Sequence, residues 1–287
     1  MEDFMDKKEE KSTGNAAYIY RPVRFYVTVF ALTWLCWGLA IAFNEGASLV
    51  GFMLAGMFMP AAVAVLTVLL SKNAALKTDF KRKLTGFYRI RPLSILIAVL
   101  VFAASVAVSI LISLLFGGSP DQFSFTEDFS FSVGGTSALL TILLASCIEE
   151  FGWRGYGEDA VGAYHTWFTE SIIFGCVWAA WHLPLFWVDG TYQYGLRQMG
   201  VIYVVNFLAS VIPLDFIQTW VYVKNRRSML ATIIFHVFIN IMQEKINMTA
   251  ETKIIETFVI AVVAAIIVLT NRDLFFEKRH IGRLLEE

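Results

Sequence analysis

The chain has 287 residues, of which 57% are hydrophobic and 16% are charged, and its formal net charge is −1 at pH 7. Soluble domains contain roughly a quarter charged residues, so this balance excludes an ordinary soluble protein and indicates an integral membrane protein. We predict an all-α polytopic fold. We expect the chain to lie in a lipid bilayer and to bind no nucleic acid.

The first 24 residues begin with the mixed-charge stretch "MEDFMDKKEEKSTGN". No small-residue cleavage site follows a short apolar core, so we predict a cytoplasmic N-terminal segment rather than a removable signal peptide. Residues 25–270 contain repeated stretches of about twenty mainly apolar residues, each long enough to cross a hydrocarbon core of about 30 Å. We predict eight transmembrane helices around a polar intramembrane cavity, and a cytoplasmic tail over 271–287. The eight predicted spans are 25–43, 48–70, 94–116, 136–153, 170–188, 199–223, 229–246 and 254–270.

The distribution of basic residues predicts the orientation of the chain. If the chain crosses the membrane eight times, twenty of its 23 Lys and Arg residues fall on one side. The other side receives only Arg197, Lys245 and Lys253. Because basic residues concentrate on the cytoplasmic side, both termini are predicted to be cytoplasmic. The basic connection 71–92 is either an ordinary cytoplasmic loop or an interfacial stretch on anionic lipid.

Ionisable residues within spans are costly, so each of them is a candidate functional residue. The fourth span ends in "CIEEFGWRGYGE", which contains Glu149, Glu150 and Arg154. Glu150 and Arg154 are four residues apart and share a helix face, so they can form a neutralising pair. Glu149 lies about 100° further around the helix and points elsewhere. The alternative interpretation is that all three residues only mark the cytoplasmic end of the helix.

The fifth span contains "FGCVWAAWHLPLFW", in which Phe174, Trp178 and His182 recur every four residues. This spacing places two aromatic rings and one imidazole on the same helix face. A single His among aromatic side chains is either a packing residue or a site residue. Pro184 can bend the helix and release carbonyl groups that need another partner.

Two later spans also carry polar residues. Asp215 follows Pro213 in the sixth span, and we interpret it as a structural partner or a cavity-lining group. His236 and Asn240 in the seventh span are four residues apart and hence on one face. Alone, this pair could simply bond a neighbouring helix. Together, however, three spans offer a carboxylate, two imidazoles and an amide suited to one site.

Three motifs in a fixed order carry a resemblance to a known family. "EEFGWR" fits E-E-x-x-x-R, "WAAWH" is similar to F-x-x-x-H with Trp178 where Phe is usual, and "HVFIN" fits H-x-x-x-N. In this order on a multispanning chain, they resemble the type II CAAX prenyl endopeptidases, also called the Abi or CPBP intramembrane proteases. The motifs cover about 136–246, and the eight-span architecture extends the resemblance to most of the chain.

The resemblance implies an endopeptidase that removes the last three residues of a CAAX C-terminus on a prenylated or otherwise lipid-anchored protein. It implies that Glu149 and His182 activate the attacking water. His236 and Asn240 would stabilise the oxyanion, as donors do strongly in a low-dielectric cavity. Because hydrolysis needs water, we expect the cavity to open toward the cytoplasm.

The same resemblance gives Glu150 and Arg154 a supporting role around Glu149. Two His and one Glu would also suit zinc. However, no H-E-x-x-H pair is present, and an activated water with His and Asn donors accounts for every motif residue without a metal. We therefore predict no metal and no other cofactor, with zinc as the alternative.

Two other classes of protein fit some of these residues. Polytopic transporters also place Glu, His and Asp within spans, and Asp215 would be central to that interpretation. The sequence lacks the paired, interrupted spans in two similar halves that many transporters have. A non-catalytic immunity or scaffold protein could retain the same fold. Replacement of Glu149 separates these alternatives, because only a hydrolase would lose cleavage.

Overall fold

The structure is a computed structural model that describes residues 18–43, 45–126 and 138–277. These residues form helices and connections, with one isolated β-bridge between Phe125 and Ile246 and no strand. The predicted all-α fold class is therefore confirmed. Most of the predicted N-terminal segment and of the predicted tail lies outside the described residues.

Every predicted span coincides with a helix. These helices are α1 (Pro22–Ala42), α2 (Gly46–Leu70), α4 (Pro92–Leu114), α5 (Ala138–Gly152), α7 (Trp167–Trp181), α9 (Val201–Lys224), α10 (Met229–Lys245) and α11 (Ala250–Thr270). The shorter helices are α3 (Ala74–Thr85), α6 (Glu158–Gly162), α8 (Tyr192–Met199) and α12 (Arg272–Phe276). Three 3₁₀ turns cover Phe87–Arg89, Pro120–Phe123 and Leu183–Trp187, and a π-helix covers Trp153–Gly157.

The predicted count of eight spans is not confirmed. Within the described residues, α1, α2, α4, α9 and α11 are long and apolar enough to cross a membrane. A sixth candidate is the segment Trp167–Trp187, which bends by 78° into α8. Helices α5 and α10 have 15 and 17 residues. At the helical rise they are roughly 22 and 26 Å long, which is shorter than a typical hydrocarbon core.

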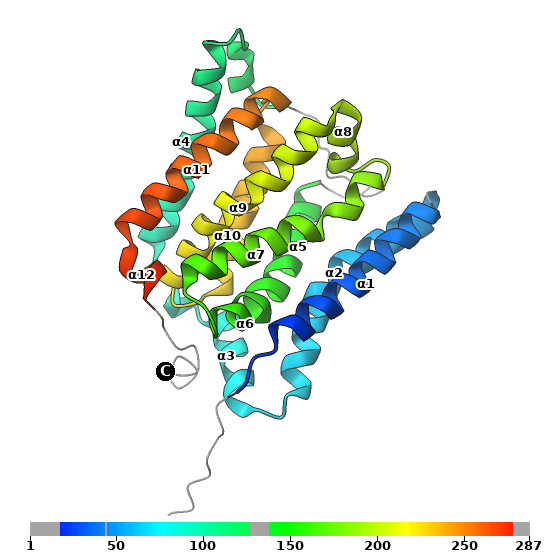
Figure 1. Cartoon of the computed structure of the whole chain (residues 1–287), viewed down its shortest axis with the longest axis vertical. Helices are drawn as coiled ribbons and strands as arrows, with labels where there is room; N and C mark the ends of the chain where they lie inside the picture. The colour runs from blue at the N-terminus through cyan, green and yellow to red at the C-terminus, as the bar shows by residue number, and fades with distance from the viewer. Residues whose placement is uncertain (1–17, 44, 127–137, 278–287) are drawn as a thin grey trace, which may run out of the picture.

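Helices α5 and α10 lie between longer helices (Figure 1), although leucines in the first half of α5 remain exposed. Helix α5 packs between α2 and α10, and α10 also contacts α4 and α9. The remaining long helices pack around them, with α1 against α2, α7 against α9, and α11 against α4 and α9. The contact between α2 and α5 depends on Gly152, because a Cβ atom there would lie 2.4 Å from the Cβ of Pro60. Any larger residue at this position would push α5 away from α2.

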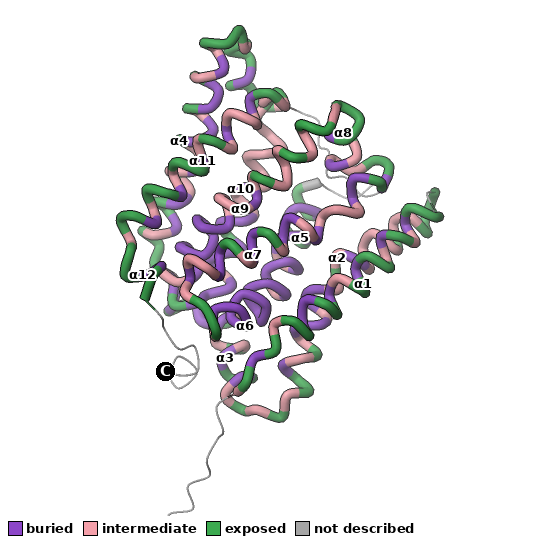
Figure 2. Tube along the Cα trace, in the orientation of Figure 1, coloured by how far each residue is buried: buried purple, intermediate pink, exposed green. Residues whose placement is uncertain are grey.

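Exposed residues follow the outer sides of the helices, and buried residues lie toward the middle of the bundle (Figure 2). Large apolar residues such as Leu100 on α4 and Val262 on α11 are exposed on the outside. The interior has an extensive apolar core, and the charged residues Glu150, Arg154 and Asp215 are fully buried in it. An apolar exterior, with charged groups paired inside, is the arrangement expected for a protein surrounded by lipid.

The basic connection 71–92 contains helix α3, which the sequence analysis did not predict. The Asn73 side chain caps its first turn by accepting a hydrogen bond from the Leu76 N–H. Lys83, in its last turn, is fully buried and donates hydrogen bonds to the carbonyls of Arg154 and Gly155. Helix α3 therefore packs into the bundle and is more than a surface loop.

Helix α5 continues directly into the π-helix that holds Arg154. The N–H of Glu158 donates to the carbonyl of Trp153, five residues earlier, as the wider π turn requires. Such turns are rare and often mark functional sites. In this protein the π-helix carries the Arg154 guanidinium into the interior, beside the last turn of α5.

Candidate active site

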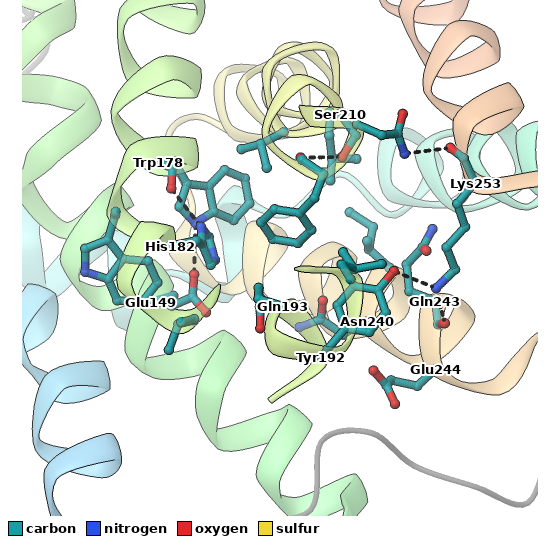
Figure 3. Close-up of a pocket in the computed structure, with 18 of the residues that line it drawn as sticks. Glu149, Trp178, His182, Tyr192, Gln193, Ser210, Asn240, Gln243, Glu244 and Lys253 are labelled. Carbon is teal, nitrogen blue, oxygen red and sulfur yellow. Dashed lines mark hydrogen bonds between the residues drawn. The ribbon is translucent and has the colours of Figure 1, made fainter. Parts of the chain in front are cut away.

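A cavity of about 240 Å³ lies between α5, α7, α9, α10 and α11. All four residues with a predicted catalytic role, Glu149, His182, His236 and Asn240, line this cavity. Figure 3 shows Glu149 and His182 at one side and Lys253 at the opposite side, with Gln193, Tyr192 and Asn240 drawn between them. Glu149 and Asn240 are 91 positions apart in the sequence, yet both face the same space.

Trp178 connects the two residues predicted to activate water (Figure 3). Its indole Nε1–H donates a hydrogen bond of 3.0 Å to Oε2 of Glu149. Its main-chain carbonyl accepts a hydrogen bond of 2.7 Å from Nδ1 of His182. A carbonyl oxygen can only accept, so Nδ1 carries the proton and Nε2 of neutral His182 has a free lone pair. One residue thus orients both a carboxylate and an imidazole.

His182 lies at a helix end rather than in the middle of the predicted span 170–188. It is the residue that ends α7, and the 3₁₀ turn containing Pro184 begins directly after it. Its ring packs edge-on against Trp181 and Phe207, with centroid distances of 4.9 and 5.3 Å. The imidazole lies on the cavity wall, at the change from α-helix to 3₁₀ turn.

His236 is held by Glu150, which lies behind the cavity wall. Nδ1 of His236 donates to Oε1 of Glu150 at 2.8 Å, and the same oxygen accepts hydrogen bonds from Gln218 and Arg154. Because Nδ1 is engaged with a carboxylate, only Nε2 is available on the cavity side. His236 can therefore donate through Nε2 only when both ring nitrogens carry protons.

The amide of Asn240 is oriented by Ser146 on α5. Its Nδ2 donates to the Ser146 hydroxyl at 3.1 Å, and that hydroxyl donates to the carbonyl of Ile142 at 2.9 Å. This chain of hydrogen bonds uses one of the two amide N–H bonds of Asn240. The other can point toward a group in the cavity.

Arg154 lies behind the catalytic wall and binds three carboxylates. Its guanidinium contacts Glu150 at 3.3 Å, Glu158 at 2.7 Å and Asp215 at 2.7 Å, and all four side chains are fully buried. Asp215 does not line the cavity, so of its two predicted roles the structure favours that of structural partner. A buried cation with several carboxylates fixes the relative positions of the segments that carry them.

Two residues behind the cavity wall, Glu158 and Gln218, were not expected from the sequence. Glu158 follows Arg154 by four residues, so the same spacing rule that paired Glu150 with Arg154 could have found it. Gln218 follows Asp215 by three residues on α9 and therefore shares its face. Its Nε2 donates to Glu150 at 3.2 Å, a contact between residues 68 positions apart that no local pattern predicts.

A second cluster of buried charges joins α3, α6 and the connection between α9 and α10. Asp159 accepts hydrogen bonds from Lys83 at 2.7 Å, from the Tyr222 hydroxyl at 3.0 Å and from Arg227. Arg227 also binds Asp79. Burial alone would raise the pKa of Asp159, but the neighbouring Arg227 and Lys83 lower it to about 2. These ion pairs hold α3, α6 and the connection between α9 and α10 in contact.

The zinc alternative concerns the placement of possible ligand side chains. Among the residues described, no three His, Cys, Asp or Glu side chains are placed to bind one metal ion. A zinc site would need three protein ligands at roughly 2 Å from one point. The prediction that the protein needs no cofactor stays a prediction.

Comparison with known proteins gives two matches. Residues 134–242 match the family model described as "Type II CAAX prenyl endopeptidase Rce1-like". The chain is also 39% identical over 267 residues to "CAAX prenyl protease 2" of Methanococcus maripaludis, an alignment that covers 92% of this chain and 98% of that protein. The segment matched by the family model contains all four predicted catalytic residues.

Proposed function

The chain belongs to the type II CAAX prenyl endopeptidase family, and we propose that it is an intramembrane endopeptidase acting near the C-terminus of prenylated CAAX-type proteins. The supporting observation is that Glu149, His182, His236 and Asn240 line one cavity although they come from three separate helical segments. The apolar exterior of the bundle supports its location in a membrane, where a lipid-anchored substrate would be found.

In the proposed reaction, Glu149 and His182 hold the attacking water. The carboxylate of Glu149 takes one proton of the water, while the Nε2 lone pair of His182 accepts a hydrogen bond from the other. The water oxygen then bonds to the scissile carbonyl carbon. When the C–N bond breaks, the proton held by Glu149 passes to the leaving nitrogen, so that a carboxylic acid and a tripeptide amine are formed. The acid then ionises by releasing the second proton of the water to solvent. The hydrogen bonds of Trp178 support this assignment because they orient both residues.

Two residues would stabilise the negative oxygen of the tetrahedral intermediate. Asn240 offers an amide N–H, and His236 offers Nε2–H when its ring is fully protonated. Loss of one such donor typically lowers kcat about 100-fold or more. Glu150 and Arg154 would contribute indirectly, since Glu150 holds His236 and Arg154 holds Glu150.

The decisive experiment is cleavage of a farnesylated CAAX peptide by the purified protein. We expect release of the C-terminal tripeptide, and we expect Glu149→Gln to lower kcat at least 1000-fold without changing the thermal unfolding midpoint. Glu244→Gln is a matched control, because this carboxylate also lines the cavity but has no proposed role in catalysis. Undiminished cleavage by Glu149→Gln would refute the mechanism, and an unprenylated peptide tests the requirement for the lipid.

The same measurement separates the protease from the two other proposals. A transporter would use its intramembrane acids to move an ion and would release no tripeptide. A non-catalytic immunity or scaffold protein would bind a partner equally well with or without Glu149. Family membership supports the protease, and the position of Asp215 in the Arg154 cluster weakens the transporter, for which this acid would have to face a pathway.

We predict from the sequence that both termini are cytoplasmic and that the cavity opens toward the cytoplasm. These two predictions concern opposite ends of the molecule. The described residues nearest both termini lie at the end with α3 and α12, whereas the cavity is lined by α8 and the first turns of α9 and α11, at the other end (Figure 1). The substitutions Arg272→Cys and Asp189→Cys, each in a variant without native cysteines, can be labelled with a membrane-impermeant thiol reagent. Labelling would show which end of the molecule faces the cytoplasm. We expect labelling of position 272 from the cytoplasm, as the basic residues predict. Cytoplasmic labelling of position 189 instead would favour a cytoplasmic opening of the cavity.

A further inference from the structure

Lys253 lines the cavity on the side away from Glu149 (Figure 3). It is the only Lys or Arg among the described residues that form the cavity wall. The basic side chains elsewhere in the interior, such as Arg154 and Arg227, each bind carboxylates directly. A cation in a mainly apolar cavity is costly unless an anion compensates it, so its presence there needs an explanation.

The contacts of Lys253 leave room for an anionic ligand. Its Nζ donates to the Tyr192 hydroxyl at 3.3 Å and to the Gln243 carbonyl at 3.2 Å, and it lies 4.8 Å from the Tyr192 ring centroid. Within the described part of the chain, no carboxylate lies within 4.0 Å of this nitrogen. An ammonium group has three N–H donors, so one remains for a ligand.

Two acidic residues, Glu244 and Glu256, line the same part of the cavity and are possible partners for the charge of Lys253. Glu256 accepts a hydrogen bond of 2.7 Å from the Gln243 amide, and Glu244 also lines the wall. Neither forms an ion pair with Lys253 by the same 4.0 Å limit. If Lys253 only balanced the charge of these acids, its replacement would affect every substrate alike, which gives the alternative a distinct experimental signature.

Ring contacts across the cavity set an upper limit on the distance from His182 to Lys253. The ring centroids of His182 and Phe207 lie 5.3 Å apart, and those of Phe207 and Tyr192 lie 6.3 Å apart. With Lys253 a further 4.8 Å away, its Nζ lies at most about 17 Å from the His182 ring centroid. Three extended residues span about 10 Å, which is within this limit.

We propose that Lys253, with Tyr192 beside it, binds the free α-carboxylate at the C-terminus of the substrate peptide. The inference rests on the proposed function, since it assumes that the peptide bond to be cleaved lies next to Glu149. An ammonium–carboxylate hydrogen bond at this position would fix the end of the chain. The cleavage site would then be set by its distance from the C-terminus as well as by the lipid.

The test compares two farnesylated peptides that differ only at the C-terminus, one with a free carboxylate and one with an amide. We expect the wild-type protein to cleave the acid with a kcat/KM at least tenfold above that of the amide. Lys253→Met should lower kcat/KM for the acid at least tenfold and change it less than twofold for the amide. Lys253→Arg, which keeps the charge, should retain part of the preference.

Matched controls distinguish this role from a loss of folding. Lys245→Met removes another lysine near the same end, one that donates to the Thr126 carbonyl and does not line the cavity, and it should leave both rates unchanged. Equal loss on both peptides in Lys253→Met would overturn the inference, and so would equal cleavage of both peptides by the wild type. Neither of those results would affect the proposed function. If the wild type cleaved neither peptide, the proposed function would fail and the inference with it.

Discussion

The Trp178 indole donates a hydrogen bond to the Glu149 carboxylate, across the contact between α7 and α5. The related motif usually has Phe at this position, and a phenyl ring could fill the space but could not donate. Trp178 also packs against His236, with ring centroids 5.5 Å apart. It therefore touches three of the four residues that we assign to catalysis, through its indole N–H, its ring and its carbonyl.

Trp178→Phe is expected to lower kcat about tenfold with little change in KM. The variant loses a hydrogen bond to a charged group, worth roughly 1.5–3 kcal/mol, but retains most of the packing. Steady-state kinetics on the farnesylated peptide would measure the effect. Trp34→Phe is a suitable control, because its indole donates to the carbonyl of Trp181 and the residue is not part of the cavity lining. Equal losses in both variants would argue against a specific role for the bond to Glu149.

Glu150→Gln is expected to lower kcat about 100-fold through its effect on His236. The change removes the charge that holds Nδ1 of the imidazole at 2.8 Å. In a His236→Ala background the same change should cost less than threefold, because residues that act as a unit are not additive. Kinetics of the two single variants and the double variant give this comparison. Additive losses would show that Glu150 acts independently of His236.

Arg154→Met is expected to destabilise the fold strongly. It would leave the buried carboxylates of Glu150, Glu158 and Asp215 without their cation, and breaking a buried ion pair typically costs about 3–5 kcal/mol. Thermal unfolding in detergent would show a large fall in the midpoint. Arg197→Met is the control, because Arg197 lies over the Trp187 ring and forms no ion pair with a described acid. A midpoint close to that of the control would contradict the proposed role of the cluster.

The lowered pKa of Asp159 predicts that the folded protein loses stability in acid. Its pKa is about 2 in the folded protein, below the ordinary value of about 3.9. A lowered pKa contributes stability that is present above the unfolded value and is lost as the pH falls toward the folded value, here between about pH 4 and pH 2. The contribution amounts to about 2–3 kcal/mol at neutral pH. Asp159→Asn should therefore unfold earlier than the wild type at pH 6, with a difference that shrinks by pH 2 in thermal melts.

Exhaustive chelation is expected to leave cleavage unchanged. The proposed water activation uses Glu149 and His182 alone, and no trio of ligands converges in the described residues. Activity after dialysis against a chelator, with the metal content measured in the same sample, would test the prediction. Loss of activity that zinc alone restores would make the metal-free mechanism wrong.

Much of the architecture could be predicted from the sequence because it depends on local properties. Apolar stretches of sufficient length fix where helices form, and seven of the eight were placed within four residues of their observed ends. The fifth was predicted to end at residue 188, but α7 ends at Trp181 and a 3₁₀ turn follows. The pairing of Glu150 with Arg154 follows from a four-residue spacing on one helix. The motif residues Glu149, His182, His236 and Asn240 could be identified without any coordinates, since they stand out as polar groups in apolar stretches.

The tertiary structure decided how these helices meet. Hydropathy does not distinguish a short helix inside the bundle from one that spans the membrane, so the positions of α5 and α10 and the number of spans could not be deduced. The bond from His236 to Glu150 joins residues 86 positions apart, and that from Arg154 to Asp215 joins residues 61 apart. Such contacts depend on the packing of whole helices, for which the local sequence contains no signal. The sequence alone thus determined which groups are polar and where helices form, and packing determined which of those groups touch.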